Sequence, residues 1–81
     1  MKIKVLGPGC MKCHKLYDEA EKAVAQAGVK AEIEKVEKIE EIMAFGVMMT
    51  PAIVIDGEVK CAGRVPQAAE IVSWITGAGK D

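Results

Sequence analysis

The sequence predicts a three-layer α/β domain with a mixed four-stranded sheet, in the order β-α-β-α-β-β-α. Apolar residues recur with a helical period in three segments, and four short segments alternate or are continuously apolar, as strands are. The pair Asp56-Gly57 is a strong hairpin signal between the last two strands. A chain of 81 residues holds one small core. We therefore expect a single domain over residues 1–77 and a flexible tail at 78–81.

Glycine and proline delimit the first strand and the first helix. Residues 2–6 alternate and then become apolar, as in a strand, and the Gly-Pro-Gly sequence at 7–9 ends it. After Cys10, apolar residues recur at i, i+3, i+4 and i+7. This pattern predicts an amphipathic helix, which Gly28 is placed to terminate.

The middle of the chain predicts an edge strand and a weaker helix. Residues 31–34 alternate between apolar side chains and glutamate, which favours a short strand with one charged face at a sheet edge. Residues 37–45 predict a helix that Gly46 closes. The charges between positions 30 and 41 are interpreted as solvated faces. The inward side of the helix is expected to consist of Ile39, Ile42 and Met43.

The last third of the chain predicts a central strand, a hairpin and a final helix. Residues 52–55 are continuously apolar and rich in β-branched side chains, as in a strand covered on both faces. Residues 58–61 return antiparallel, and alternation puts Val59 and Cys61 on one face. Pro66 suits the first turn of the last helix. The apolar side of that helix consists of Ala68, Ile71, Val72 and Ile75.

The order of the elements also sets the strand directions. Because a helix joins the first two strands, we expect them to be parallel, with a right-handed crossover. The last two strands form an antiparallel hairpin. Helices must cover the apolar sheet, and this requirement gives the three layers.

The composition argues against several classes of function. Acidic and basic residues nearly cancel (12 against 11), so the chain has no electrostatic footprint for nucleic acid or an anionic membrane. No apolar run approaches the roughly 20 residues that cross a bilayer, and the N-terminus has no signal-peptide pattern. Three cysteines in such a chain point to the cytoplasm, where a structural disulfide framework would not persist. We expect a cytoplasmic monomer whose thiols have a chemical role.

Cys10 and Cys13 form a C-x-x-C pair at the start of the first helix. This spacing brings two sulfurs close enough for a disulfide, and next to a βαβ pattern it indicates a redox-active dithiol. Cys10 lies where unpaired backbone N–H groups and the helix dipole favour a thiolate. Lys12 and His14 add positive charge nearby.

The two cysteines have different expected roles. A thiolate is the attacking form in disulfide exchange, so Cys10 is the candidate nucleophile. Cys13 lies one turn into the helix on the apolar stripe, more protonated and shielded, and is the candidate resolving thiol. The alternative is a pair of inert thiols packed at the helix start, and the glycines before Cys10 argue against it. His14 is interpreted as a solvated helix residue, in preference to a ligand or a modulator of the thiolate.

Thr50-Pro51 is expected to lie at the same edge of the sheet. Proline is tolerated at the first residue of a strand, and a strand that opens at Pro51 begins beside Cys10. An X-Pro bond can be cis, and a cis bond here would turn the backbone of residues 49 and 50 toward the thiols. An extended partner chain can hydrogen-bond to that backbone. An ordinary trans proline that caps the strand is the alternative.

These motifs resemble the thioredoxin/glutaredoxin superfamily, in particular its short archaeal and bacterial thioredoxin-like members, which are redox-active disulfide proteins. The likeness covers nearly the whole chain. The motifs that carry it are Gly-Pro-Gly-Cys10-Met-Lys-Cys13, Thr50-Pro51 before Ala-Ile-Val-Ile, Asp56-Gly57, and Gly63-Arg64-Val65-Pro66.

The resemblance implies a thiol–disulfide oxidoreductase of thioredoxin-like fold. It implies a cis peptide bond at Pro51, with Cys10 as the nucleophile and Cys13 as the resolving thiol. It further implies exchange with disulfide-containing proteins and regeneration by a thioredoxin-reductase-like flavoprotein. The chain itself is expected to hold no flavin, nicotinamide or metal.

The sequence departs from the superfamily in three places, one of which is the absence of a Trp before Cys10. Met11-Lys12 separates the cysteines, in place of the Gly-Pro of thioredoxins or the Pro-Tyr of glutaredoxins, so the reduction potential does not carry over. Cys61-Ala62-Gly63-Arg64 stands where many glutaredoxins hold glutathione with Gly-Gly and an acidic pair. This replacement favours thioredoxin-like exchange.

The residues expected to contact a partner surround this site. Met48 and Met49 either offer a soft apolar surface to a partner peptide or belong to the core. Arg64 either binds an acidic group of the partner or balances surface charge. Cys61 is either a third redox thiol at this edge or a small buried hydrophobe. The expected partner-binding residues are Met49, Thr50, Pro51, Gly63 and Arg64, with Lys12, His14 and Cys61 as modulators.

Two other functions compete with disulfide exchange. The run from Cys10 to His14 matches C-x-x-C-H, the c-type haem attachment motif, but the hairpin at 52–61 argues against a mostly helical cytochrome. The C-x-x-C pair also suits Cu(I) or Zn(II), and a soft-metal binding module is the better alternative. Small metallochaperones with this motif end in a strand, whereas this chain ends in a helix. A complete zinc site also needs more ligands than this pair supplies.

Overall fold

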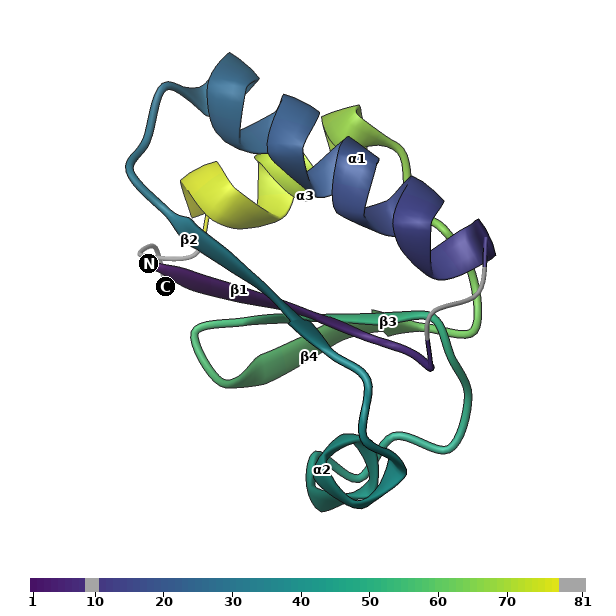
Figure 1. Cartoon of the computed structure of the whole chain (residues 1–81). Helices are drawn as coiled ribbons and strands as arrows, with labels where there is room; N and C mark the ends of the chain where they lie inside the picture. Colours follow the sequence, from purple (N-terminus) through teal and green to yellow (C-terminus); the bar gives the residue numbers. More distant parts are fainter. Residues whose placement is uncertain (9–10, 78–81) are drawn as a thin grey trace.

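The described part of the chain contains seven elements in the predicted order β-α-β-α-β-β-α (Figure 1). The structure is a computed structural model that describes residues 1–8 and 11–77, except for the side chain of Lys12. The tail expected at 78–81 lies outside the described residues. The elements are β1 (Lys2–Leu6), α1 (Met11–Ala27), β2 (Glu32–Val36), α2 (Ile39–Ala44), β3 (Ala52–Ile55), β4 (Glu58–Ala62) and α3 (Ala68–Gly77).

Within the described residues, the sheet has four strands in the order β2-β1-β3-β4. β1 and β2 are parallel, with Leu6 opposite Val36, whereas β3 runs antiparallel to both β1 and β4. The predicted parallel pair, the predicted hairpin and the edge position of the second strand are therefore confirmed.

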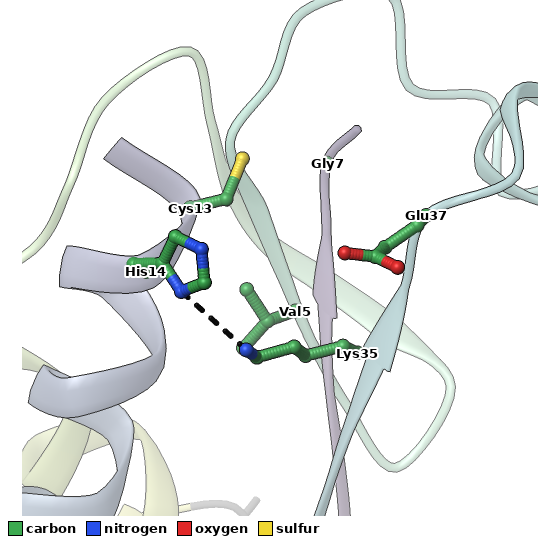
Figure 2. A pocket seen from close by; sticks show the side chains of 6 residues that line it. All are labelled: Val5, Gly7, Cys13, His14, Lys35 and Glu37. Atoms are coloured by element: carbon green, nitrogen blue, oxygen red, sulfur yellow. Dashed lines mark hydrogen bonds between the residues drawn. The ribbon is translucent and has the colours of Figure 1, made fainter. Parts of the chain in front are cut away.

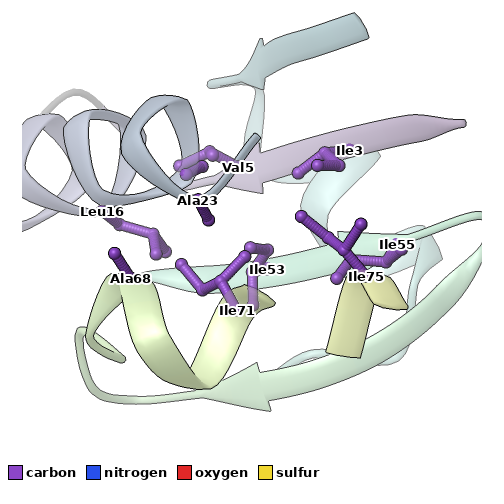
Figure 3. Packing of buried hydrophobic residues seen from close by; sticks show 10 residues of the cluster. Ile3, Val5, Leu16, Ala23, Ile53, Ile55, Ala68, Ile71 and Ile75 are labelled. Carbon is purple, nitrogen blue, oxygen red and sulfur yellow. The ribbon is translucent and has the colours of Figure 1, made fainter. Parts of the chain in front are cut away.

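Helices cover both faces of the sheet and give the three predicted layers. Figure 1 shows α1 and α3 side by side over one face, and α2 beneath the other. β3 is buried along its whole length, because Ile53 and Ile55 pack toward α1 and α3 while Ala52 and Val54 pack toward α2. The larger cluster, shown in Figure 3, contains Ile3, Val5, Leu16, Ala20, Ala23, Ile53, Ile55, Ala68, Ile71 and Ile75.

The predicted helix end at Gly28 and the predicted hairpin turn at Asp56-Gly57 are confirmed by their backbone conformations. α1 ends at Ala27, and Gly28 follows with a φ of 67°, the left-handed conformation in which glycine is favoured. At the hairpin, Asp56 and Gly57 have φ values of 49° and 85°, as the two central residues of a type I′ turn require.

The predicted inward face of the second helix is wrong at two of its three positions. Ile42 is buried, but Ile39 and Met43 are 59% and 66% exposed. α2 has only six residues and is shorter than predicted. Since so short a helix reaches the sheet with little more than one side chain, Ile42 alone of the three packs with Leu6 and Val36.

The predicted common face of Val59 and Cys61 is also wrong. The register of β4 shifts between Ile53 and Val54, so that Cys61 lies opposite Ile53 and Val59 lies opposite Val54. The extra residue, Lys60, is a β-bulge and breaks the alternation. As a result Cys61 packs against the larger cluster, while Val59 is 37% exposed.

The beginning of α3 is tied to α1 by a carboxylate. Glu19 in α1 accepts a hydrogen bond from the backbone N–H of Ala68, the first residue of α3, at 2.8 Å. Helix N-termini expose such N–H groups, and a carboxylate is well suited to satisfy them. This hydrogen bond is the main cause that lowers the pKa of Glu19 below its ordinary value of 4.5, with Lys22 contributing further.

We predict that Glu19→Ala lowers the free energy of unfolding at neutral pH and that the deficit shrinks in acid. A carboxyl whose pKa is lowered by folding stabilises the folded state above its unfolded value, here 4.5, and the contribution is lost as the pH falls through the folded-state pKa. Urea denaturation followed by far-UV circular dichroism over this pH range measures the deficit. Glu21→Ala, at an exposed position of the same helix, is the matched control. A deficit independent of pH would contradict the assignment.

Candidate functional site

The candidate site lies at the edge of the sheet where β1 ends, α1 begins and β3 starts. The chain leaves β1 at Gly7 and Pro8, and the described residues resume at Met11 in the first turn of α1. Cys10, the candidate nucleophile, and the Lys12 side chain lie outside the described part of the structure. Cys13 is described and is buried, with 6% of its surface exposed.

The sulfur of Cys13 packs directly on the backbone of Gly7. A Cβ atom placed on Gly7 would lie 2.0 Å from Cys13 Sγ and 3.2 Å from Cys13 Cβ, so no larger residue fits while Cys13 keeps this position. Gly7 is buried and donates its N–H to the carbonyl of Val36 at 2.9 Å, which fixes it to β2. The sequence pattern predicts Gly7 only as the residue that ends the first strand. Its contact with Cys13 depends on which residue α1 brings over it, and the local sequence does not contain that information.

Pro51 lies at this edge with its cis geometry confirmed. The Thr50-Pro51 peptide bond is cis, and Pro51 is buried. Thr50 Cβ lies 3.9 Å from the place that a Cβ on Gly7 would occupy, so the residues before β3 meet Gly7 beside Cys13. The structure therefore brings the predicted residues Cys13, Thr50 and Pro51 together.

Gly63 continues the site on the other side of Pro51. Its N–H donates to the carbonyl of Pro51 at 2.9 Å, and the Cβ position that it lacks lies 3.2 Å from Met49 Cε. Met49 and Met48 are 62% and 96% exposed, so of the two alternatives for these residues the surface position is correct.

Arg64 is turned toward α3 and paired within the chain. Its two terminal nitrogens donate to the two carboxylate oxygens of Glu70 at 2.9 and 3.1 Å. These hydrogen bonds raise the pKa of Arg64 and lower the pKa of Glu70, which also accepts from the backbone of Gln67. The Arg64 guanidinium is thus paired with a carboxylate of α3, and both side chains are exposed.

The two remaining modulators differ in their surroundings. Cys61 is half-buried against the larger core cluster and is opposite Ile53. His14 is exposed, next to Cys13, as a solvated helix residue is expected to be. Its Nδ1 lies 3.4 Å from Nζ of Lys35, so it has a specific neighbour on β2.

A small pocket lies directly beside Cys13 (Figure 2). Its volume of about 10 Å³ is close to the space that one water molecule needs. Lys35 is held over it by His14 and by the ring of Tyr17, whose centroid is 4.9 Å from Lys35 Nζ. The described residues that line the pocket are Val5, Gly7, Cys13, His14, Lys35 and Glu37.

Lys35 and Glu37 were missed by the sequence analysis, which interpreted the charges of this segment as solvated faces. Both side chains are exposed, so that interpretation is correct in part. However, β2 pairs in parallel with β1, and Val36 binds Gly7, so the end of β2 reaches the same edge as Cys13. Since Lys35 and Glu37 alternate with Val36, both project toward the α1 side of the sheet.

An exposed apolar groove extends from this site along α2. Met43 and Met48 are exposed here, and Pro8 and Thr50 connect the groove to the edge that holds Cys13. The groove is lined by Pro8, Ile39, Ile42, Met43, Val47, Met48 and Thr50.

Two negative observations apply to the described residues. Among residues 1–8 and 11–77, no group of three or more His, Cys, Asp or Glu side chains is arranged to hold a metal ion. In the same part of the chain, no helix has the length and apolar character needed to cross a membrane.

Comparison with known proteins gives one family. The thioredoxin domain family model matches residues 1–76. The chain is 39% identical to a thioredoxin of Methanothermobacter thermautotrophicus over 71 residues, which cover 88% of this chain and 92% of the relative. It is 38% identical to a thioredoxin of Methanocaldococcus jannaschii over 69 residues, which cover 85% of this chain and 79% of that protein.

We predict that Gly7→Ala displaces the Cys13 sulfur. The added methyl group would overlap Sγ, so the free energy of unfolding should fall by about 1–3 kcal/mol, as for other overpacked sites. Cys13 should also react faster with an alkylating reagent. Urea denaturation and mass spectrometry after timed alkylation measure the two effects.

Gly77→Ala is the control, because a Cβ at Gly77 has nothing within 4 Å. Equal stability of the native chain and Gly7→Ala would show that the sulfur does not depend on this contact.

Proposed function

This chain belongs to the thioredoxin family and is a thiol–disulfide oxidoreductase in the general sense, and we propose that Cys10 and Cys13 are its exchanging pair. One observation supports the proposal above the others. The Cys13 sulfur is held against Gly7 in the first turn of α1, and the cis-proline segment at Thr50-Pro51 meets it there. A partner disulfide that reaches Pro51 therefore also reaches the beginning of the helix.

The proposed exchange proceeds in two steps. In the first, the Cys10 thiolate attacks one sulfur of the partner disulfide, and the other partner sulfur leaves as a thiolate. In the second, the Cys13 thiolate attacks Cys10 in the mixed disulfide, and the remaining partner sulfur leaves. The partner gains two electrons and becomes a dithiol, while Cys10 and Cys13 become a disulfide.

The partner surface consists of the residues around Pro51. Exposed methionines adapt to varied apolar side chains, and Met49 lies on Gly63 beside the cis proline. The backbone of residues 49 and 50 can pair with an extended segment of the partner. Arg64 contributes indirectly, because its pairing with Glu70 positions the turn that carries Gly63.

The physiological cycle needs an external source of electrons. Thioredoxins act on disulfide-containing proteins and are typically reduced by a thioredoxin reductase. A flavoprotein of this type is the proposed reductant for the disulfide between Cys10 and Cys13. The proposed setting is the cytoplasm, with the chain acting as a monomer.

We predict that Cys13→Ser accumulates mixed disulfides with protein partners, whereas Cys10→Ser reduces exchange to background. Without the resolving thiol the first step still proceeds, and without the nucleophile neither step begins. Non-reducing electrophoresis detects the mixed disulfides, and reduction of insulin by dithiothreitol measures the exchange.

Cys61→Ser provides the control, because Cys61 is half-buried on β4 against the larger core cluster, and the variant should keep exchange within about twofold of the native rate. Equal residual activity in Cys10→Ser and Cys13→Ser would exclude the assigned roles. A loss of activity in Cys61→Ser with native stability would assign Cys61 to the site.

A further inference from the structure

The methionines of this chain lie on its surface. Methionine is among the residue types that are most often buried, yet all five methionines of the chain are exposed. Met11 lies in the first turn of α1, Met43 lies in α2, and Met48 and Met49 follow between α2 and β3. Figure 1 shows that the segment from α2 to β3 runs on the side of the sheet at which α1 begins. Four exposed thioethers thus belong to the elements that meet at the proposed exchange site.

Met48 and Met49 directly precede Thr50 and the cis proline. The Met48 side chain is 96% exposed and lines the same groove as Thr50. Sδ of Met49 lies 3.4 Å from the Cβ position that Gly63 lacks, and the Gly63 N–H donates to the carbonyl of Pro51. Both side chains therefore belong to the surface that a partner chain would cover when it reaches Pro51.

The exposure of a thioether governs how readily it is oxidised. A hydroperoxide converts methionine to methionine sulfoxide, which replaces a flexible apolar side chain by a polar one. The described thiols are less accessible than these methionines, because Cys13 is buried and Cys61 is half-buried. After the proposed exchange has joined Cys10 and Cys13 in a disulfide, neither of them offers a thiolate to the oxidant. In that state the most accessible reduced sulfurs of the described residues are methionines.

We propose that Met48 and Met49 form a methionine sulfoxide modification site that weakens exchange with protein disulfides, an inference that rests on the function proposed above. The oxidant is a hydroperoxide. Its O–O bond breaks, its terminal oxygen forms a bond to the methionine sulfur, and the proton of that oxygen passes to the departing oxygen, which leaves as an alcohol or as water. The sulfur is oxidised by two electrons and the peroxide is reduced by two, so each sulfoxide consumes one hydroperoxide.

The sulfoxide acts on the surface and leaves the exchanging thiols chemically unchanged. A protein partner must cover the methionine side chains to bring its disulfide to the site, and a polar sulfoxide there opposes the burial of its apolar groups. A small aromatic disulfide such as DTNB reaches a thiol without covering this surface. Oxidation therefore selects against protein disulfides. A methionine sulfoxide reductase reverses the modification.

The modification is tested on the Cys61→Ser chain, in which the third thiol is absent. The disulfide form is treated with hydrogen peroxide, tandem mass spectrometry locates the sulfoxides, and dithiothreitol then restores the dithiol while the sulfoxides remain. We predict sulfoxides at Met48 and Met49 and a fall of about tenfold in the rate of insulin reduction, as expected when apolar contacts are lost from an interface. After gel filtration removes the dithiothreitol, the rate with DTNB should equal that of untreated protein.

The matched variants separate these two methionines from the others. Met48→Leu combined with Met49→Leu keeps apolar side chains without the sulfur, and peroxide should lower its insulin rate much less, relative to its own untreated sample. Met43→Leu removes a thioether of similar exposure from α2 and should lose its rate as the Cys61→Ser parent does. Met48→Gln combined with Met49→Gln places polar groups there without peroxide and should be slow with insulin from the start. Circular dichroism verifies that each variant is folded.

Four outcomes would overturn the inference and leave the function intact. They are an unchanged insulin rate in protein that carries both sulfoxides, oxidation of Met43 without oxidation of Met48 and Met49, an equal loss in the double leucine variant, and an equal loss with DTNB. The last result would place the damage at the thiols. If the untreated chain reduces neither insulin nor DTNB, the proposed function itself fails.

Discussion

The contact between the Cys13 sulfur and the backbone of Gly7 is the constraint on which the site depends. It joins the end of β1 to the first turn of α1 at a distance that only a glycine allows. The Val36 carbonyl fixes Gly7 from the other side, and Thr50 approaches the same point. One residue without a side chain therefore sets the spacing of three segments that are far apart in the sequence.

The topology of the sheet explains why these segments meet. β1 lies between β2 and β3, parallel to one and antiparallel to the other, so the end of β1 lies beside the end of β2 and the start of β3. The same edge receives the apolar Pro51 segment from one neighbour and the charged Lys35 and Glu37 from the other. The Cys13 thiol thus has the Pro51 segment on one side and a pocket with charged side chains on the other.

Features of the fold that depend on local signals could be predicted, whereas those set by pairing between distant residues could not. Asp56-Gly57 and Gly28 adopt the positive φ values that their turns need, and the buried strand at 52–55 follows from its own residues. The bulge at Lys60 arises from how β4 pairs with β3, and local alternation in β4 carries no sign of it. In the site, the cysteine motif and Pro51 were visible, but the pocket depends on the parallel pairing that places Glu37 beside Gly7.

The two outer strands of the described sheet have different protection against unwanted association. β2 carries Glu32, Glu34 and Lys35, whose charges oppose the addition of another strand. β4 is interrupted by its bulge, which twists its outer side away from regular pairing. Intermolecular strand addition, the route to aggregation of open sheets, is therefore discouraged at both margins. Under the proposed function, an extended partner peptide pairs instead with the backbone before Pro51, where Met48 and Met49 are exposed.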